Sequence, residues 1–79
     1  MDLTKNEMKL AVEIAQILDD TESIEFHKAL VKQYSESYLR EKLNVVLKIP
    51  KDKIRTSRAA YYNYLVSHNA KHKKNNFRD

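Results

Sequence analysis

The chain contains no glycine in its 79 residues. Glycine takes up positive φ angles at little steric cost, so glycine-rich phosphate loops and two-residue β-hairpin turns depend on it. A chain of this length forms one domain with a small core. The absence of glycine therefore excludes a β-sandwich or a dinucleotide-binding fold, and it predicts an all-α domain that is a small, compact bundle of four helices.

The first predicted helix covers residues 5–18 and follows Thr4, which together with Glu7 has the spacing of a capping box. Its polar positions form one narrow stripe, which consists of Lys9, Glu13, Gln16 and Asp20. The rest of its circumference is apolar or small, and a helix of that kind is normally surrounded by protein. We therefore expect it to be the central helix of the bundle, or a helix shared with a second copy in a homo-oligomer.

The second predicted helix covers residues 22–34, with Thr21 as its N-cap. Its charged stripe leaves an inward face that consists of Phe26, Leu30, Val31 and Tyr34. His27 lies within this apolar face, which predicts a histidine at the edge of the core whose polar atoms are satisfied by hydrogen bonds.

The third predicted helix is capped within the segment 35–37, where Ser, Glu and Ser interrupt the apolar pattern. It ends near Lys48, because Pro50 cannot continue a helix and disfavours helical angles in the residue before it. Glu36 and Arg40 have the spacing of a stabilising ion pair on one helix face. The inward positions are Leu39, Leu43, Val46 and Leu47.

Residues 50–56 predict a loop with a single turn of its own, and Thr56 or Ser57 then caps a fourth helix that runs to about Ala70. On that helix Leu65 lies in the middle of the apolar face, and Tyr64 lies on the polar side. Beyond it, one residue in nine is apolar, which predicts a flexible basic tail. We therefore expect a helical domain over residues 1–70 and a disordered tail over 71–79.

Charge is distributed very unevenly along the chain. Residues 1–47 contain six Lys or Arg and nine Asp or Glu, a net charge of −3. Residues 48–79 contain nine Lys or Arg and two Asp, a net charge of +7. This polarity is the strongest functional signal in the sequence, and it indicates a polyanionic partner for the second part of the chain.

The cations of the second part form two clusters, one at each end of the fourth helix. The first consists of Lys51, Lys53, Arg55 and Arg58, and it surrounds a helix N-terminus, where free backbone N–H groups favour an anion. We expect Lys53, Arg55 and Arg58 to converge on a phosphate together with the hydroxyls of residues 56 and 57. The second cluster, about 20 Å away along the helix, contains Lys71, Lys73 and Lys74.

Five tyrosines accompany these cations, and aromatic rings beside positive charges are a feature of proteins that bind single-stranded nucleic acid. Tyr64 is the one we predict to make a surface contact, by stacking or as a wedge. The other four, by their helical spacing, are predicted to be boundary residues with buried rings and hydroxyls in water: Tyr34, Tyr38, Tyr61 and Tyr62.

Several classes of function find no support in the sequence. No nucleophile stands in a recognisable catalytic motif, so we expect neither an enzyme nor a cofactor nor a small-molecule substrate. The pair His68 and His72 has metal-ligand spacing but lacks a third ligand, so no metal site is expected. The chain has no cysteine, no signal-peptide pattern, and no apolar run longer than the four residues 59–62. We therefore expect a soluble, cytoplasmic protein without membrane contact.

Together these features predict a non-enzymatic accessory module that binds DNA or RNA, single- or double-stranded, through backbone phosphates. The connection over residues 48–56 is too long for a helix-turn-helix, and no element suits the reading of bases, so binding should be weakly sequence-specific and steeply salt-dependent. The alternative is a protein-interaction adaptor, which self-associates through its first helix or docks its basic end on an acidic partner.

Overall fold

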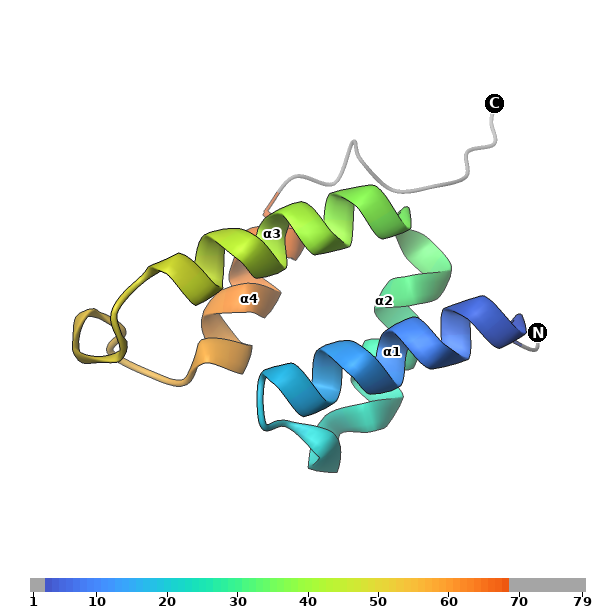
Figure 1. Ribbon diagram of the computed structural model, residues 1–79, viewed down its shortest axis with the longest axis horizontal. Coiled ribbons are helices and arrows are strands. Elements are labelled where there is room, and N and C mark those ends of the chain that lie inside the picture. Colours follow the sequence, from blue (N-terminus) through green and yellow to red (C-terminus); the bar gives the residue numbers. More distant parts are fainter. Residues whose placement is uncertain (1–2, 69–79) are drawn as a thin grey trace.

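The computed structural model describes residues 3–68, which form four α-helices and two short 3₁₀ turns, and no β-strand (Figure 1). This confirms the all-α fold. The α-helices are α1 (Lys5–Ile17), α2 (Ile24–Gln33), α3 (Glu36–Lys48) and α4 (Arg58–Ser67), and the 3₁₀ turns are η1 (Thr21–Ser23) and η2 (Lys51–Lys53).

Helix α1 begins with the predicted capping box. The Thr4 hydroxyl accepts a hydrogen bond of 3.0 Å from the Glu7 backbone N–H, and the Glu7 carboxylate accepts one of 2.9 Å from the Thr4 N–H. Each side chain satisfies a backbone donor that the first turn of a helix leaves free.

The end of α1 shows how a chain without glycine makes a left-handed turn. Asp19 has a φ of 55°, a region that glycine normally occupies and that Asp tolerates better than most other residues. Its backbone N–H donates to the carbonyl of Gln16 (3.1 Å), and the N–H of Asp20 donates to the carbonyl of Ala15 (2.7 Å). These two bonds are those of a Schellman motif, which closes the helix with Asp where Gly is the usual residue.

The start of the second helix differs from the prediction. Thr21 is not its N-cap, because residues 21–23 form the 3₁₀ turn η1 and α2 begins only at Ile24. The N–H of Ser23 donates to the carbonyl of Asp20 at 3.0 Å, which closes η1. After the turn at Asp19, the chain therefore forms this tighter 3₁₀ turn before α2 begins.

The remaining helix ends follow their local signals. The Ser35 hydroxyl accepts from the N–H of Tyr38 (3.3 Å) and the Ser57 hydroxyl from the N–H of Ala60 (3.0 Å), which confirms serine caps on α3 and α4. Helix α3 stops at Lys48 before Pro50, as predicted. Helix α4 ends at Ser67 with His68 as its C-cap, and positions 69 and 70 of its expected extension lie outside the described residues.

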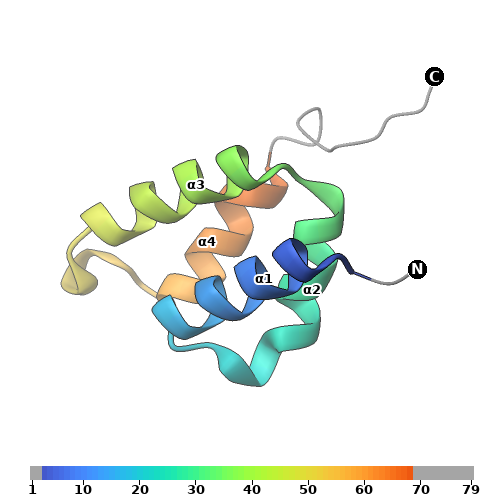
Figure 2. The ribbon, with the colours of Figure 1, turned by 45° about the vertical axis from the view of Figure 1, so that its right-hand side comes forward.

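The helices pack as two consecutive pairs, α1 with α2 and α3 with α4 (Figures 1 and 2). The segment between α3 and α4, which contains η2, projects from one end of the molecule, away from the start of α1 (Figures 1 and 2). This segment carries three of the four cations of the first cluster (Lys51, Lys53 and Arg55), so the fold presents them at an extremity, and Arg58 follows as the first residue of α4.

A charged clamp joins the two pairs. The Arg40 guanidinium on α3 donates one hydrogen bond of 2.9 Å from each terminal nitrogen to the two carboxylate oxygens of Glu13 on α1. Its Nε also donates to Glu36 at 2.7 Å, which confirms the predicted pair within α3. The contact with Glu13 was not predicted, because that residue was assigned to the solvent stripe of its helix.

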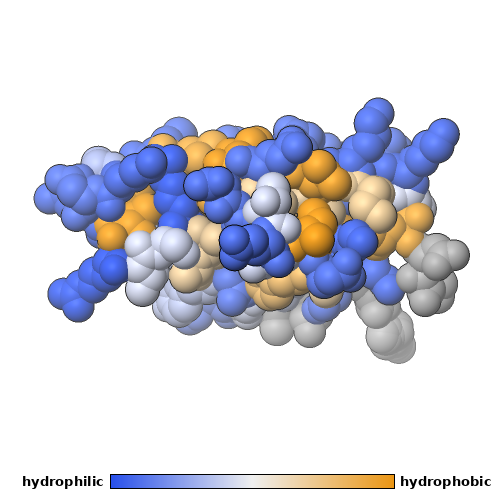
Figure 3. Space-filling view, turned by 90° about the horizontal axis from the view of Figure 1, so that it is seen from below, coloured by the Kyte–Doolittle hydropathy of each residue, from blue (hydrophilic) through white to orange (hydrophobic). Residues whose placement is uncertain are grey.

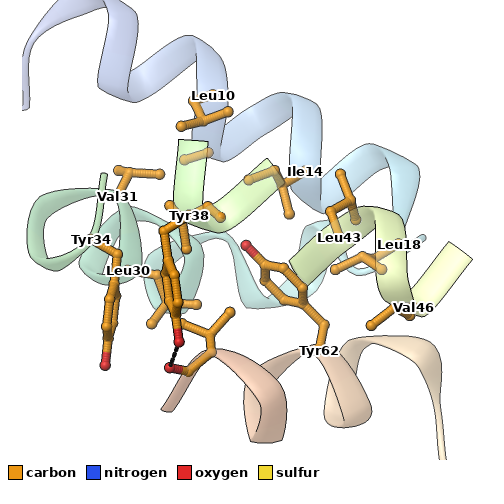
Figure 4. Packing of buried hydrophobic residues seen from close by; sticks show 13 residues of the cluster. Leu10, Ile14, Leu18, Leu30, Val31, Tyr34, Tyr38, Leu43, Val46 and Tyr62 are labelled. Carbon is orange, nitrogen blue, oxygen red and sulfur yellow. Dashed lines mark hydrogen bonds between the residues drawn. The ribbon is translucent and has the colours of Figure 1, made fainter. Parts of the chain in front are cut away.

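All four helices contribute to one core (Figure 4). Tyr62 extends from α4 among apolar side chains that include Ile14 and Leu43 (Figure 4), and both Tyr62 and Val66 are fully buried. The buried face of α4 is thus centred on these two residues, and Leu65, predicted to be its middle, is partly buried at the margin.

Two predicted core residues are exposed. Phe26 is exposed at the surface of α2, and its ring contacts the ring of the buried His27 edge-on, with centroids 5.5 Å apart. Leu47 is exposed because α3 buries Tyr38. Tyr38 and Leu47 lie nine positions apart. At about 100° per residue they are on opposite sides of α3, so one packed face cannot contain both.

Helix α1 is not the central helix. Met8, Val12 and Ile17 are 38, 36 and 41% exposed, so apolar surface remains on both flanks of its buried stripe. On the face seen from below, Figure 3 shows apolar areas separated by charged and polar side chains. No helix within residues 3–68 has the length and apolar character that crossing a membrane requires.

Candidate nucleic-acid interface

The candidate interface is built on the basic loop, residues 48–58, which joins α3 to α4. Pro50 starts the turn η2, which is closed by hydrogen bonds from Lys53 N–H to Pro50 O (2.9 Å) and from Ile54 N–H to Lys51 O (3.1 Å). Lys51, Lys53 and Arg55 are exposed along the loop. The single turn predicted here is therefore confirmed, and it contains two of the predicted cations, Lys51 and Lys53.

A first hollow of about 290 Å³ lies between the basic loop and the end of α1. Lys51 and Arg58 bring positive charge to it, and Asp19 is the one acid in its lining. The other lining residues are Leu18, Ile54, Thr56 and Ser57. This hollow therefore combines two cations with hydroxyl groups beside the N-terminus of α4.

A second hollow of about 320 Å³ lies against the same loop. Lys53, Arg55 and Tyr61 line it, together with Ile49, Ile54 and Thr56. Ile54 and Thr56 line both hollows and separate them. The three cations predicted to converge on one phosphate are divided between the two adjacent hollows: Arg58 lines the first, and Lys53 and Arg55 line the second.

Donor groups remain available at the first hollow. The Ser57 oxygen accepts the capping bond from Ala60, which leaves its O–H proton free to donate. The Nε of Arg58 also has no hydrogen-bond partner within residues 3–68, but it is buried, so it is not itself accessible to a ligand. Guanidinium and hydroxyl donors at a helix N-terminus are the groups that bind phosphate oxygens in proteins.

Tyr64 is 56% exposed, which confirms its predicted place at the surface. Its ring lies nearly parallel to that of Tyr61 (15° between planes, centroids 6.3 Å apart) and is stacked on His68 (30°, 5.0 Å). We call Tyr61, Tyr64 and His68 the aromatic strip. Tyr61 was predicted only as a boundary residue. Its spacing of three residues from Tyr64, which is followed four residues later by His68, places the three rings on one side of a helix and could have indicated the strip.

Three other tyrosines are structural. Tyr34, Tyr38 and Tyr62 have buried rings, as predicted, and Tyr61 is half-buried. Their hydroxyls are not all in water, however. The Tyr38 hydroxyl donates to the carbonyl of Val66 at 2.9 Å (Figure 4), and that of Tyr62 is buried without a hydrogen-bond partner in the described part of the chain.

His27 is 1% exposed, and its Nε2 lies 2.9 Å from a carboxylate oxygen of Asp20. This confirms a buried histidine held by a hydrogen bond, although its Nδ1 has no partner within residues 3–68. In that same range, no three Asp, Glu or His side chains come together in a way that could hold a metal ion. The predicted site residues Lys71, Lys73 and Lys74, and also His72, lie outside the described residues.

Comparison with protein-family models, with curated proteins and with solved structures found no match for this chain. What the interface can bind therefore has to follow from its own chemistry. It offers exposed cations, hydroxyl and guanidinium donors in two adjacent hollows, and an aromatic strip that begins at the second of them.

Proposed function

We propose that the protein is a non-enzymatic nucleic-acid-binding module that holds backbone phosphates at the basic loop. The observation that carries the proposal is the charge polarity of the chain, −3 over residues 1–47 and +7 over 48–79, together with the projection of the basic loop from one end of the fold. A polyanion that approaches this end is attracted by the loop cations, and Asp19 is the one acid that lines either of the two hollows there. Long-range attraction of this kind is the main source of affinity in non-specific nucleic-acid binding.

The two hollows suit a chain of phosphates better than a single anion. Each hollow contains two cations, and they lie side by side because Ile54 and Thr56 line both. Successive phosphates of one strand can then be bound by successive hollows. Of the four cations only Arg58 belongs to an α-helix, and it is the partly buried first residue of α4, which supports weak sequence specificity.

Charge reversal in the loop tests this proposal. The variant Lys53→Glu/Arg55→Glu changes two exposed residues, and the variant Lys5→Glu/Lys9→Glu makes the same change of net charge at two exposed residues of α1. Affinity for DNA and RNA, single- and double-stranded, is measured by fluorescence anisotropy over a range of salt concentrations.

We expect the loop variant to bind at least tenfold more weakly at low salt, and the α1 variant to be affected much less. The slope of log affinity against log salt should also become shallower for the loop variant, by about 0.7 to 0.9 for each phosphate that it no longer neutralises. Equal losses of affinity in both variants, or none in either, would refute the proposal. Equally tight binding of poly-glutamate at the same salt would indicate an acidic protein as the partner instead.

Self-association through α1 is the second candidate function. Met8 and Val12 lie one turn apart on one flank of this helix, and more than a third of each side chain is exposed. Sedimentation velocity over a range of concentrations tests it with Met8→Asp/Val12→Asp. The control is Ile17→Asp, which changes an exposed residue on the opposite flank. A wild-type chain that is monomeric throughout would exclude this candidate.

A further inference from the structure

Helix α4 has two functional faces. Tyr62 and Val66 lie in the core. At about 100° per residue, Tyr61, Tyr64 and His68 lie on the side of the helix roughly opposite to those two buried residues. Apart from the part of Tyr61 that packs at the core margin, the aromatic strip therefore lies at the surface and is not needed to close the core.

The rings of the strip are ordered with respect to each other. The near-parallel planes of Tyr61 and Tyr64, followed by the stacked pair of Tyr64 and His68, form a series along the helix. From Tyr61 to His68 the helix rises about 10 Å. These rings already stack on one another, so a base would stack on the part of the Tyr64 ring that they leave uncovered, and Tyr64 is the most exposed of the large hydrophobic residues at 56%.

The strip is joined to the cations. Tyr61 lines the second hollow together with Lys53 and Arg55, so positive charge lies directly at one end of the series of rings. An apolar surface that served only to contact another protein would not require cations beside its aromatic rings. Cations beside exposed aromatic rings are the combination that binds the phosphates and the base faces of one strand together.

We infer that the aromatic strip binds the bases of single-stranded nucleic acid, whose backbone lies in the hollow formed with Lys53 and Arg55. The inference rests on the proposed function and narrows it from nucleic acid in general to unpaired strands. In a duplex the base faces are stacked on their neighbours, whereas in a single strand they are free to stack on Tyr64. Stacking on a ring accepts every base, which agrees with weak sequence specificity.

The test compares Tyr64→Ala with Tyr64→Phe, in which the aromatic ring is kept. The ligands are a single-stranded DNA, an RNA of the same sequence and the matched DNA duplex. We expect Tyr64→Ala to weaken single-strand binding about tenfold, to leave duplex binding unchanged, and to leave the salt slope as it was. Tyr64→Phe should bind within about twofold of wild type, because it keeps the stacking face.

A second measurement reports on stacking itself. The chain contains no tryptophan, so its intrinsic fluorescence comes from tyrosine, and a base stacked on Tyr64 should quench it. Single strands should therefore quench the wild type more than Tyr64→Ala. His68→Ala should weaken single-strand binding less than Tyr64→Ala does, because His68 lies at the far end of the strip from the cations.

The two proposals fail in different ways. Equal affinity for single strands and duplex, with Tyr64→Ala neutral on both, would overturn the inference about the strip. The proposed function would survive that result if Lys53→Glu/Arg55→Glu still bound more weakly. Binding to none of the three ligands would overturn both. Tighter binding of the DNA strand or of the RNA strand would show which of the two nucleic acids the strip prefers.

Discussion

The hydroxyl of Tyr38 on α3 donates a hydrogen bond of 2.9 Å to the carbonyl oxygen of Val66 in the last turn of α4. The carbonyls of a last helical turn have no partner within their own helix. Within residues 3–68 this buried bond satisfies the Val66 carbonyl, and it ties the end of α4 to α3.

The first prediction compares the two buried tyrosines of this region. Tyr38→Phe removes the donor to Val66, and we expect it to lower the free energy of unfolding by about 1 kcal/mol. Tyr62→Phe removes a buried hydroxyl that has no partner within residues 3–68, so it should leave stability unchanged or raise it. Urea denaturation followed by circular dichroism measures both. A larger loss of stability for Tyr62→Phe than for Tyr38→Phe would contradict the assigned roles.

Tyr62 also predicts how the stability of the fold changes at alkaline pH. Burial, and then the nearby Tyr38, raise the pKa of the Tyr62 phenol above its ordinary value of 10.0. Above pH 10 the unfolded chain therefore releases this proton before the folded chain does, and the stability that holds below pH 10 is lost as the pH rises. Tyr62→Phe should lose less stability than wild type between pH 9 and pH 11 (values chosen on either side of the ordinary phenol pKa). Parallel decreases in the two proteins would contradict this.

The clamp between α1 and α3 predicts an acid dependence. The hydrogen bonds from Arg40, and then its charge, outweigh desolvation and lower the pKa of Glu13 from the ordinary value of 4.5. The stability gained is present above that value and is lost as the pH falls through the lower pKa of the folded state. Glu13→Gln should therefore lower the melting temperature at pH 7, and the difference from wild type should disappear in strong acid. Added salt should weaken the effect, because both side chains are partly exposed.

A control for the clamp is available within α3. Glu36 also contacts Arg40, but both residues belong to one helix, so Glu36→Gln leaves the connection to α1 in place. Its melting temperature should change less than that of Glu13→Gln. If Glu36→Gln has the larger effect, the clamp does not stabilise the packing of the two helix pairs.

The turn at Asp19 predicts that glycine would stabilise this glycine-free chain. A residue other than glycine at a φ of 55° carries a steric cost, so Asp19→Gly should raise the free energy of unfolding by about 1 kcal/mol. Asp19→Asn removes the negative charge but keeps a side chain that tolerates the left-handed region. Asp19→Ala removes both the charge and that tolerance. We expect stability to decrease in the order Gly, Asn, Ala. A destabilised Asp19→Gly would show that the carboxylate has another structural role.

Local signals in the sequence were sufficient for most of the fold. The Thr4 capping box, the serine caps at positions 35 and 57 and the stop at Pro50 each depend on residues within one helical turn, so they can be recognised without knowing the packing. The first turn of α2 was missed because Thr21 looked like a cap. In the structure, the left-handed Asp19 determines the local path of the chain there.

Which flank of each helix enters the core was less predictable. His27 and Phe26 are neighbours with similar apolar context, and only the contact of His27 with Asp20 shows why His27 is the buried one. The clamp between Glu13 and Arg40 joins residues 27 positions apart, which no periodicity can indicate.

The sequence predicted the charge of the candidate site, but it did not predict the two hollows or the aromatic strip. The concentration of cations after residue 47 was visible in the sequence. The division of these cations between two hollows depends on η2, and the participation of Tyr61 depends on the nearly parallel placement of its ring beside that of Tyr64. Both are consequences of tertiary packing, which the sequence pattern does not contain.

Helix α4 is held at both ends, by the Ser57 cap at its start and by the bond from Tyr38 to the Val66 carbonyl in its last turn. The aromatic strip is thus carried by a helix that is already fixed in place before any ligand arrives. A strand that stacks on it would lose its own conformational freedom, but the protein would lose little, so the entropic cost of complex formation would fall almost entirely on the ligand. Variants that loosen either end of α4 would shift part of that cost to the protein and weaken binding without touching a residue of the binding surface.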